Sequence, residues 1–144
     1  MSTITNTEIA DILNDLIRIN NDRVHWYERI LGDLRPEDSD LEGVFQTNLR
    51  KLRSHNEFLE EEVRDLELNI INGCAAAEEN VFKGNNRHAI LMNCEAGGIA
   101  AERAYQRVLE NPMLPGYLKE LLGEQREELE KMRRRIEALK STAL

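Results

Sequence analysis

Apolar side chains recur at every third or fourth position along most of the chain, a spacing that places them on one face of an α-helix. Four stretches follow this pattern, and each can bury its apolar stripe only by packing against the others. Four amphipathic helices of similar length do so most simply as a bundle. The sequence therefore predicts an all-α fold, a single four-helix-bundle domain over residues 1–144, with helices at about residues 7–34, 40–72, 87–110 and 115–140.

Prolines and capping residues mark the expected helix ends. Thr5 and Glu8 have the spacing of a capping box, in which the first residues of a helix satisfy each other's backbone N–H groups. Ser39 and Glu42 repeat this spacing at the start of the second helix. The 3 prolines of the chain all fall where helices should begin or end: Pro36, Pro112 and Pro115.

The connection between the second and third helices runs from Cys74 to His88 and is long enough for a short extra helix at about residues 75–82. Its length suits either a crossover or a plain return. The 2 cysteines, Cys74 and Cys94, lack metal-site spacing, so we expect buried, reduced thiols. The chain begins without a signal-peptide pattern and holds no apolar stretch of membrane-spanning length, so we expect a cytoplasmic protein without a membrane partner.

The charge of the chain argues against a nucleic-acid partner. Its formal net charge is −8 at pH 7, whereas contacts with phosphate groups need a basic surface. The only cationic cluster is Arg133 to Arg135, and Glu128 and Glu130 lie about one helical turn before it, where they can form ion pairs. We therefore interpret this cluster as the solvated end of the fourth helix.

Polar residues interrupt the apolar stripes near the middle of every helix. Helices packed side by side bring their midpoints to a similar depth, so these residues should form one layer in the core. Buried polar groups must find hydrogen-bond partners. The layer is therefore either a metal or small-ligand site, or a hydrogen-bonded network that fixes the helix register, and we favour the network. The residues of this polar core layer are Asn20, Tyr27, Asn48, His55, Asn56, Glu102, Tyr105 and Gln125.

A metal site has only partial support in the sequence. A di-iron carboxylate bundle uses four carboxylates and two histidines, with Glu-x-x-His on two helices. The chain has no Glu-x-x-His and 3 histidines in all. A reduced site for iron, manganese or zinc is the alternative, with Glu28, His55, Glu95 and Glu102 as its ligands. No phosphate-binding loop, nucleophile elbow or Cys-x-x-Cys motif is found, so we expect a protein that is not an enzyme.

Several runs resemble a bacterial family of ferritin-like domains of unknown function, four-helix bundles related to rubrerythrin and ferritin. The resemblance covers most of the chain and implies a ferritin-like bundle. It is carried by Ile12 to Ile17, Asn20 to Asp22 and Tyr27-Glu28 in the first helix, Phe45 and Arg50 in the second, Ile90 to Glu95, Tyr105 and Leu109 in the third, and Gln125 and Ile136 in the fourth.

The chain departs from this family at the positions that would bind metal. The family tends to have an acid three residues after the equivalent of Glu95, where this chain has Gly98. It tends to have a histidine near the end of the fourth helix, where this chain reads Lys131 to Arg135. The resemblance thus implies a ferritin-like protein with an eroded metal site, and it does not carry iron storage or iron oxidation to this chain.

A second apolar line follows the first helix beside its core stripe. Ile12, Ile19 and Trp26 are seven residues apart, and Ile30 lies alongside. An exposed line of this kind needs a cover. The cover is either the Cys74–His88 segment, with Val81 and Phe82, or a second copy of the chain, and we favour a homodimer. Two apolar residues of the second helix, Val44 and Phe58, lie off its core stripe and could extend the patch.

The third helix is rich in small residues, with Gly97 and Gly98 in its middle. Glycine inside a helix costs about 1 kcal/mol relative to alanine, so close approach of a neighbouring helix would explain it. A small-molecule pocket opened by these residues is a further possibility. The first hypothesis is nevertheless a non-enzymatic bundle that acts through assembly or binding, and the second is a ferritin-like metal-binding protein.

Overall fold

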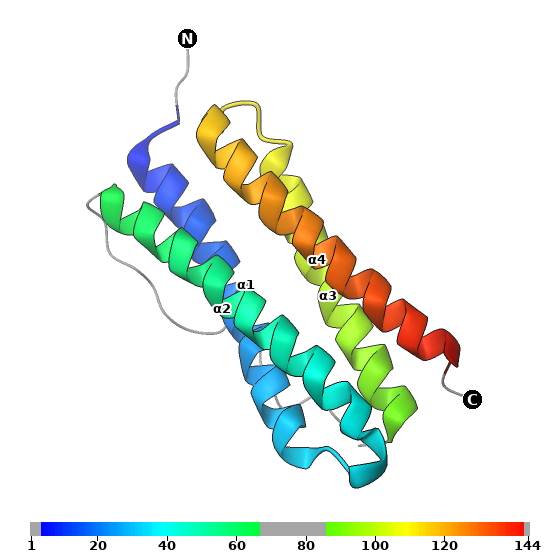
Figure 1. Ribbon diagram of the computed structural model, residues 1–144. Coiled ribbons are helices and arrows are strands. Elements are labelled where there is room, and N and C mark those ends of the chain that lie inside the picture. Colours follow the sequence, from blue (N-terminus) through cyan, green and yellow to red (C-terminus); the bar gives the residue numbers. More distant parts are fainter. Residues whose placement is uncertain (1–3, 67–85, 143–144) are drawn as a thin grey trace.

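Four long helices lie side by side in the structure, a computed structural model that describes residues 4–66 and 86–142 (Figure 1). The fold is an all-α four-helix bundle, as predicted, and the described residues include no strand. The elements are α1 (Asn6–Asp33), the short 3-10 helix η1 (Pro36–Asp38), α2 (Ser39–Asp65), α3 (Arg87–Leu109) and α4 (Gly116–Thr142).

Helices α2 and α3 run in the same direction, so the end of α2 and the start of α3 lie at opposite ends of the bundle (Figure 1). An ion pair at one end agrees with this topology. Arg87, the first residue of α3, donates to both carboxylate oxygens of Asp40 in the first turn of α2, at 2.8 Å each, and to Asp38 at 3.2 Å. The hydrogen bond from Arg87 lowers the pKa of Asp40.

Two of the helices are capped at their N-termini by side-chain hydrogen bonds. The predicted capping box of α1 forms: Glu8 N donates to Thr5 Oγ1 at 3.1 Å, and Thr5 N donates to Glu8 Oε1 at 3.2 Å. At the start of α3, the side chain of Asn86 accepts a hydrogen bond from Ala89 N at 2.8 Å. These bonds satisfy backbone N–H groups that have no partner within the helix.

The capping box predicted at Ser39 does not form. The turn η1 runs directly into α2, so Ser39 is already helical and Asp38 is the N-cap, without a capping hydrogen bond. The side chain of Asp38 is instead buried, at 4% exposure, where it receives the bond from Arg87. Asp38 therefore contributes to the contact between α2 and α3.

One apolar core runs through the bundle and receives residues from all four helices. Its largest side chains are Tyr27, Phe45 and Tyr105, each at 0% exposure. Two residues that we placed on or beside the outer apolar line belong to this core instead. Ile30 is 1% exposed and Val44 is 8% exposed, because both stripes are wider than the sequence pattern indicated.

Some predictions fall on residues 67–85, which lie outside the described residues. They are the continuation of the second helix to residue 72, the extra helix at about 75–82, the burial of Cys74 and the cover by Val81 and Phe82. Within the described residues, none of the helices combines the length and the apolar character needed to cross a membrane.

Candidate functional site

Four polar side chains, one from each helix, meet in the middle of the bundle. Asn20 of α1 donates through Nδ2 to Oδ1 of Asn56 in α2, at 3.0 Å, and to the hydroxyl of Tyr105 in α3, at 2.9 Å. The Tyr105 hydroxyl donates to Gln125 Oε1 of α4 at 2.7 Å. Gln125 Nε2 donates to the backbone carbonyl of His55 at 3.2 Å. These bonds form one continuous network across the bundle.

The network is buried and nearly saturated. Asn20 and Tyr105 are 0% exposed. Asn56 uses its own Nδ2 hydrogens on the Ile17 carbonyl, at 3.2 Å, and on Asn21 Oδ1, at 2.9 Å. Burial raises the pKa of Tyr105 well above its usual range, so its hydroxyl remains protonated and keeps donating. Of the network's amide atoms, Oδ1 of Asn20 is the one buried without a partner in the described part of the chain.

A second polar cluster surrounds the hydroxyl of Tyr27, further along α1. Asn48 Nδ2 donates to it at 3.1 Å, and Arg23 Nη2 donates to it at 3.2 Å. The Cys94 sulfur lies 3.2 Å away. Burial raises the pKa values of both Tyr27 and Cys94, so the phenol and the thiol both hold their protons. Cys94 is a buried free thiol, as expected, whereas its bond to Tyr27 could not be foreseen.

His55 lies at the edge of the central network and is 4% exposed. Its Nε2 is 3.4 Å from Glu128 Oε1, a long contact for a hydrogen bond, and its Nδ1 is buried without a partner among the described residues. Burial lowers the pKa of His55, because the charged imidazolium loses more hydration than the neutral ring. The side chain is therefore neutral near pH 7.

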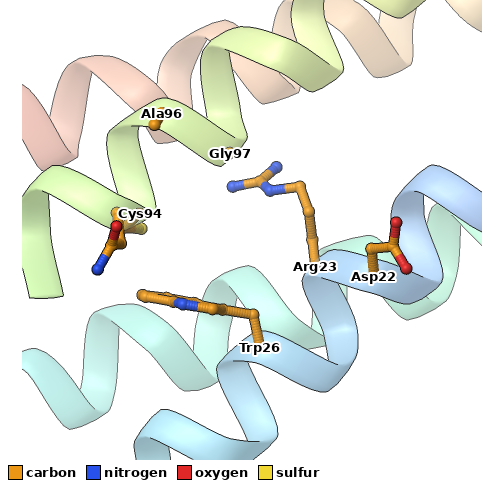
Figure 2. Close-up of a pocket in the computed structure, with 7 residues that line it drawn as sticks. Asp22, Arg23, Trp26, Cys94, Ala96 and Gly97 are labelled. Atoms are coloured by element: carbon orange, nitrogen blue, oxygen red, sulfur yellow. The ribbon is translucent and has the colours of Figure 1, made fainter. Parts of the chain in front are cut away.

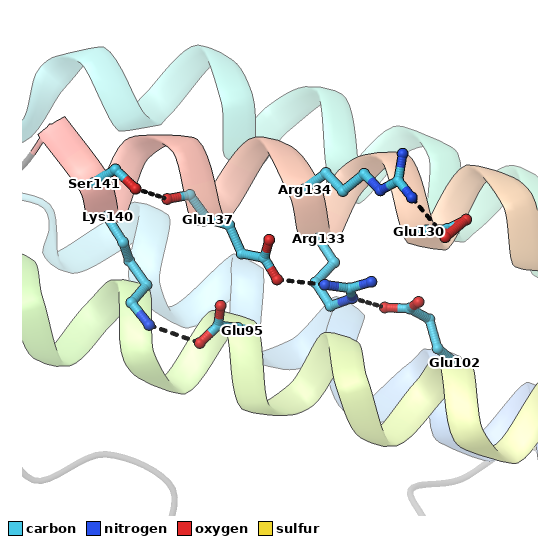
Figure 3. Close-up of polar contacts among 8 residues, drawn as sticks. All are labelled: Glu95, Glu102, Glu130, Arg133, Arg134, Glu137, Lys140 and Ser141. Carbon is cyan, nitrogen blue, oxygen red and sulfur yellow. Dashed lines mark hydrogen bonds and ion pairs between the residues drawn. The ribbon is translucent and has the colours of Figure 1, made fainter.

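Glu102 does not join the interior network, contrary to the sequence prediction. It turns to the α3/α4 seam and pairs with Arg133, which also pairs with Glu137 (Figure 3). One end of the same seam holds a second pair, in which Lys140 Nζ donates to Glu95 Oε1 at 2.7 Å (Figure 3). A residue at the border of an apolar stripe can turn either way, and here the arginine draws the carboxylate outward.

The four residues proposed as metal ligands do not come together. Glu28 is exposed and pairs with Arg53, while Glu95 and Glu102 have the partners just described. His55 faces Glu128 instead. Among the residues that the structure describes, no group of 3 or more His, Cys, Asp or Glu could hold a metal ion.

The outer apolar line of α1 lies along a groove between α1 and α3. Ile12 and Ile19 are half-buried in its wall, opposite Ala104 and Val108, and the groove has a volume of about 750 Å³. Trp26 is half-buried and packs edge-to-face on Tyr27, with ring centroids 5.2 Å apart. Phe58 of α2 is 53% exposed, which leaves it open to a partner.

Comparisons with known proteins give a fold and no family. No family model matches the sequence, and no curated protein matches it. A mutant of Dps1 from Mycobacterium smegmatis has a TM-score of 0.86 at 15% identity, over 97% of this chain and 99% of the other. A ferritin-like, diiron-carboxylate protein from Bacillus anthracis has a TM-score of 0.80 at 13% identity, over 94% and 96%. The fold is ferritin-like.

The interior of this ferritin-like bundle does not fit a di-iron centre. Such a centre needs carboxylates from all four helices and two histidines, all projecting inward. Here the helices instead meet at the centre of the bundle through Asn20, Asn56, Tyr105 and Gln125, each of which is hydrogen-bonded within this set. Neutral amides and a protonated phenol cannot balance the charge of two iron ions.

Some residues of the ferritin-like interior escaped the sequence analysis. Arg23 and Asn21 complete the two clusters, although their positions beside the stripe gave no signal of their own. The ion pairs of the α3/α4 seam did leave a signal. Glu95 and Glu102 are seven residues apart, as are Arg133 and Lys140, so antiparallel helices can match both pairs at once.

Proposed function

We propose that this chain is a single-domain, cytoplasmic, ferritin-like bundle that is not an enzyme and acts through assembly or binding. In this proposal, the polar layer in the interior is structural: it fixes how the four helices align along their length. A buried network of this kind favours one register, because a slip by one turn would leave several amides without partners.

The observation that carries the proposal is the neutrality of the central network. Asn56, Asn20, Tyr105 and Gln125 bond one another in a continuous chain of contacts that uses nearly all of their donors and acceptors. The nearby carboxylate Glu102 is already neutralised by Arg133. A metal ion would have to displace both sets of bonds, and the network itself would offer it amide oxygens and the Tyr105 hydroxyl but no carboxylate.

The metal content of the purified protein tests this proposal. We expect untagged protein to carry iron, manganese and zinc far below one ion per chain, as measured by plasma mass spectrometry. Glu102→Gln should leave that content unchanged, and so should the control Glu124→Gln, which alters an exposed carboxylate of α4. Near-stoichiometric metal that Glu102→Gln removes and Glu124→Gln retains would overturn the proposal.

A ferritin-like metal-binding protein is the second candidate, because one structure with this fold is described as a diiron-carboxylate protein. On this chain the available ligands would be Glu28, Glu95 and Glu102 with His55. Each carboxylate would first have to leave its Arg or Lys partner. Saturable binding of ferrous iron, weakened by His55→Gln and by Glu102→Gln alike, would favour this candidate.

Assembly is proposed to occur through the outer line of α1, with a second copy of the chain as the partner. Ile12 and Ile19 are half-buried at the α1/α3 groove, and a partner would remove their remaining surface from water. A homodimer formed in this way would be isologous, with the same groove on both copies. The mass of the protein in solution tests this point, as argued in the Discussion.

A further inference from the structure

A cavity of about 380 Å³ lies between the middle of α1 and the middle of α3. Figure 2 shows the guanidinium of Arg23 and the indole of Trp26 on two sides of the space, with α3 across from the indole at Ala96 and Gly97. This volume is at the lower end of the range for small-molecule pockets, about 300–1,000 Å³, and suits a molecule of one or two rings.

Small residues of α3 make the cavity possible. A Cβ atom on Gly97 would lie 3.8 Å from Arg23 Nε, in van der Waals contact with it, so any larger side chain would enter the space. Gly97 and Ala96 leave the Arg23 side chain room to extend across the seam towards α3 (Figure 2).

The walls offer hydrogen-bond donors that the described residues do not use. Arg23 Nη2 donates to the Tyr27 hydroxyl at 3.2 Å, but Arg23 Nη1 is buried without a partner in the described part of the chain. Trp26 Nε1 is likewise buried and unpartnered there. Two unsatisfied buried donors are costly, and both require an acceptor. Asn93 adds an amide to the lining.

The guanidinium of Arg23 is held in position rather than free. Its Cζ lies 5.6 Å from the centre of the Tyr27 ring, a cation–π distance, and its Nη2 bond fixes its orientation. The carboxylate of Asp22, which also borders the cavity, points away from the indole (Figure 2). The cavity therefore presents a fixed guanidinium beside one aromatic face, with the Asp22 carboxylate at its border.

We propose that this cavity binds a small, flat organic carboxylate, with its carboxylate on Arg23 and its ring against Trp26. A planar guanidinium suits a carboxylate because it can donate two parallel hydrogen bonds. An indole face suits a flat ring, which stacks on it or meets it edge-on. This binding goes beyond the proposed function, since it would stand whether or not the interior holds a metal.

Trp26 supplies the readout for a test, because it is the only tryptophan of the chain. Benzoate, titrated to millimolar concentrations into the full-length protein, should change the Trp26 fluorescence in a saturable way. Benzamide has the same shape without the charge, and its affinity should be lower than that of benzoate by a factor of about ten or more. Equal binding of benzoate and benzamide, or no saturable change with benzoate, would overturn the proposal.

Two variants locate the site. Arg23→Gln removes the charge and should weaken benzoate binding about tenfold or more, whereas Arg29→Gln, an exposed arginine of the same helix, should leave it unchanged. Gly97→Leu fills the cavity without touching the charge and should abolish binding while calorimetry shows the protein folded. Binding that survives Gly97→Leu, or that falls equally with Arg29→Gln, would place the ligand elsewhere and refute the assignment.

Discussion

The hydroxyl of Tyr105 donates to Gln125 Oε1 at 2.7 Å while it accepts from Asn20 Nδ2 at 2.9 Å. This phenol thereby links α3 to both α4 and α1 at the centre of the bundle. Asn20 also donates to Asn56 on α2, so one tyrosine lies at the junction of contacts that reach every helix. The Tyr105 hydroxyl oxygen therefore takes part in two of the hydrogen bonds that connect the four helices.

Removing that oxygen should destabilise the protein. In Tyr105→Phe, Gln125 Oε1 loses its donor and stays buried, and Asn20 keeps only its bond to Asn56. Leaving a buried acceptor unsatisfied costs about 1–3 kcal/mol in the free energy of unfolding, and we expect a loss in that range from urea denaturation. Tyr117→Phe, at a position 54% exposed, is the matched control and should change stability by less than about 0.5 kcal/mol. Equal losses in the two variants would contradict the role given to the network.

His55 should make stability depend on pH. Burial lowers its pKa from the ordinary 6.5, so the unfolded chain takes up a proton at a higher pH than the folded protein does. The stabilisation is therefore complete above the unfolded-state value near 6.5 and is lost as the pH falls from there towards the folded-state value. The steepest loss for one group is about 1.4 kcal/mol per pH unit.

Thermal or urea denaturation at about pH 8 and about pH 5 measures this effect. Part of the loss on acidification in the unmodified protein should disappear in His55→Gln, which cannot take up the proton. His88→Gln, in an exposed position of α3, is the control and should keep the full loss. If His55→Gln and the unmodified protein respond identically, His55 is not held neutral by burial.

Swapping the two charges of the Glu102–Arg133 pair should restore part of the stability that a single charge reversal removes. Glu102→Arg alone places two cations together in a seam where the side chains are only 12% and 21% exposed, and it should lower stability by about 1–3 kcal/mol. Adding Arg133→Glu restores an opposite pair, although Glu137 then faces a carboxylate, so we expect recovery of about half of the loss. A double variant no more stable than Glu102→Arg alone would show that the two side chains do not interact.

The sequence was sufficient for the helices, because each one carries its own apolar stripe and some carry their own caps. Thr5 with Glu8 acts within a few residues, so its pattern alone predicts the N-terminus of α1. The direction of α3 could not be predicted from such local patterns. It depends on the path between residues 66 and 86, and the length of that connection permits both directions. The Arg87–Asp40 ion pair agrees with α3 running parallel to α2. Its two residues are 47 positions apart, so no local pattern indicated that they would meet.

The candidate site was only partly predictable for a related reason. Periodicity assigns a residue to a face, and it succeeded for Asn20 and Gln125, which lie at the centre of their stripes. Glu102 borders its stripe, so its direction was decided by Arg133 on another helix. The cavity beside Gly97 exists because α3 has small residues there and because the long side chain of Arg23 on α1 borders the same space. The sequence indicated the small residues of α3, but it did not indicate that Arg23 faces them.

Self-association is best tested at Ile19, at the α1/α3 groove. Trp26→Ala should also lower the mass of a homodimer, but Trp26 packs on Tyr27 and on Phe45 within the same chain, at 5.2 and 5.9 Å, so its loss would disturb the core as well. Ile19 is half-buried, and Ile19→Glu would place a charge in the interface that a second copy would have to cover.

Light scattering coupled to size-exclusion chromatography should give twice the chain mass of 16.6 kDa for the unmodified protein and the single mass for Ile19→Glu. Ile99→Glu is the matched control, because Ile99 is also half-buried but lies beside Glu102 and Arg126, away from the groove. It should keep the dimer mass, since the substitution adds the same charge outside the interface. A single-chain mass in the unmodified protein, or a dimer that persists in Ile19→Glu, would mean that this line of α1 is not covered by a second copy.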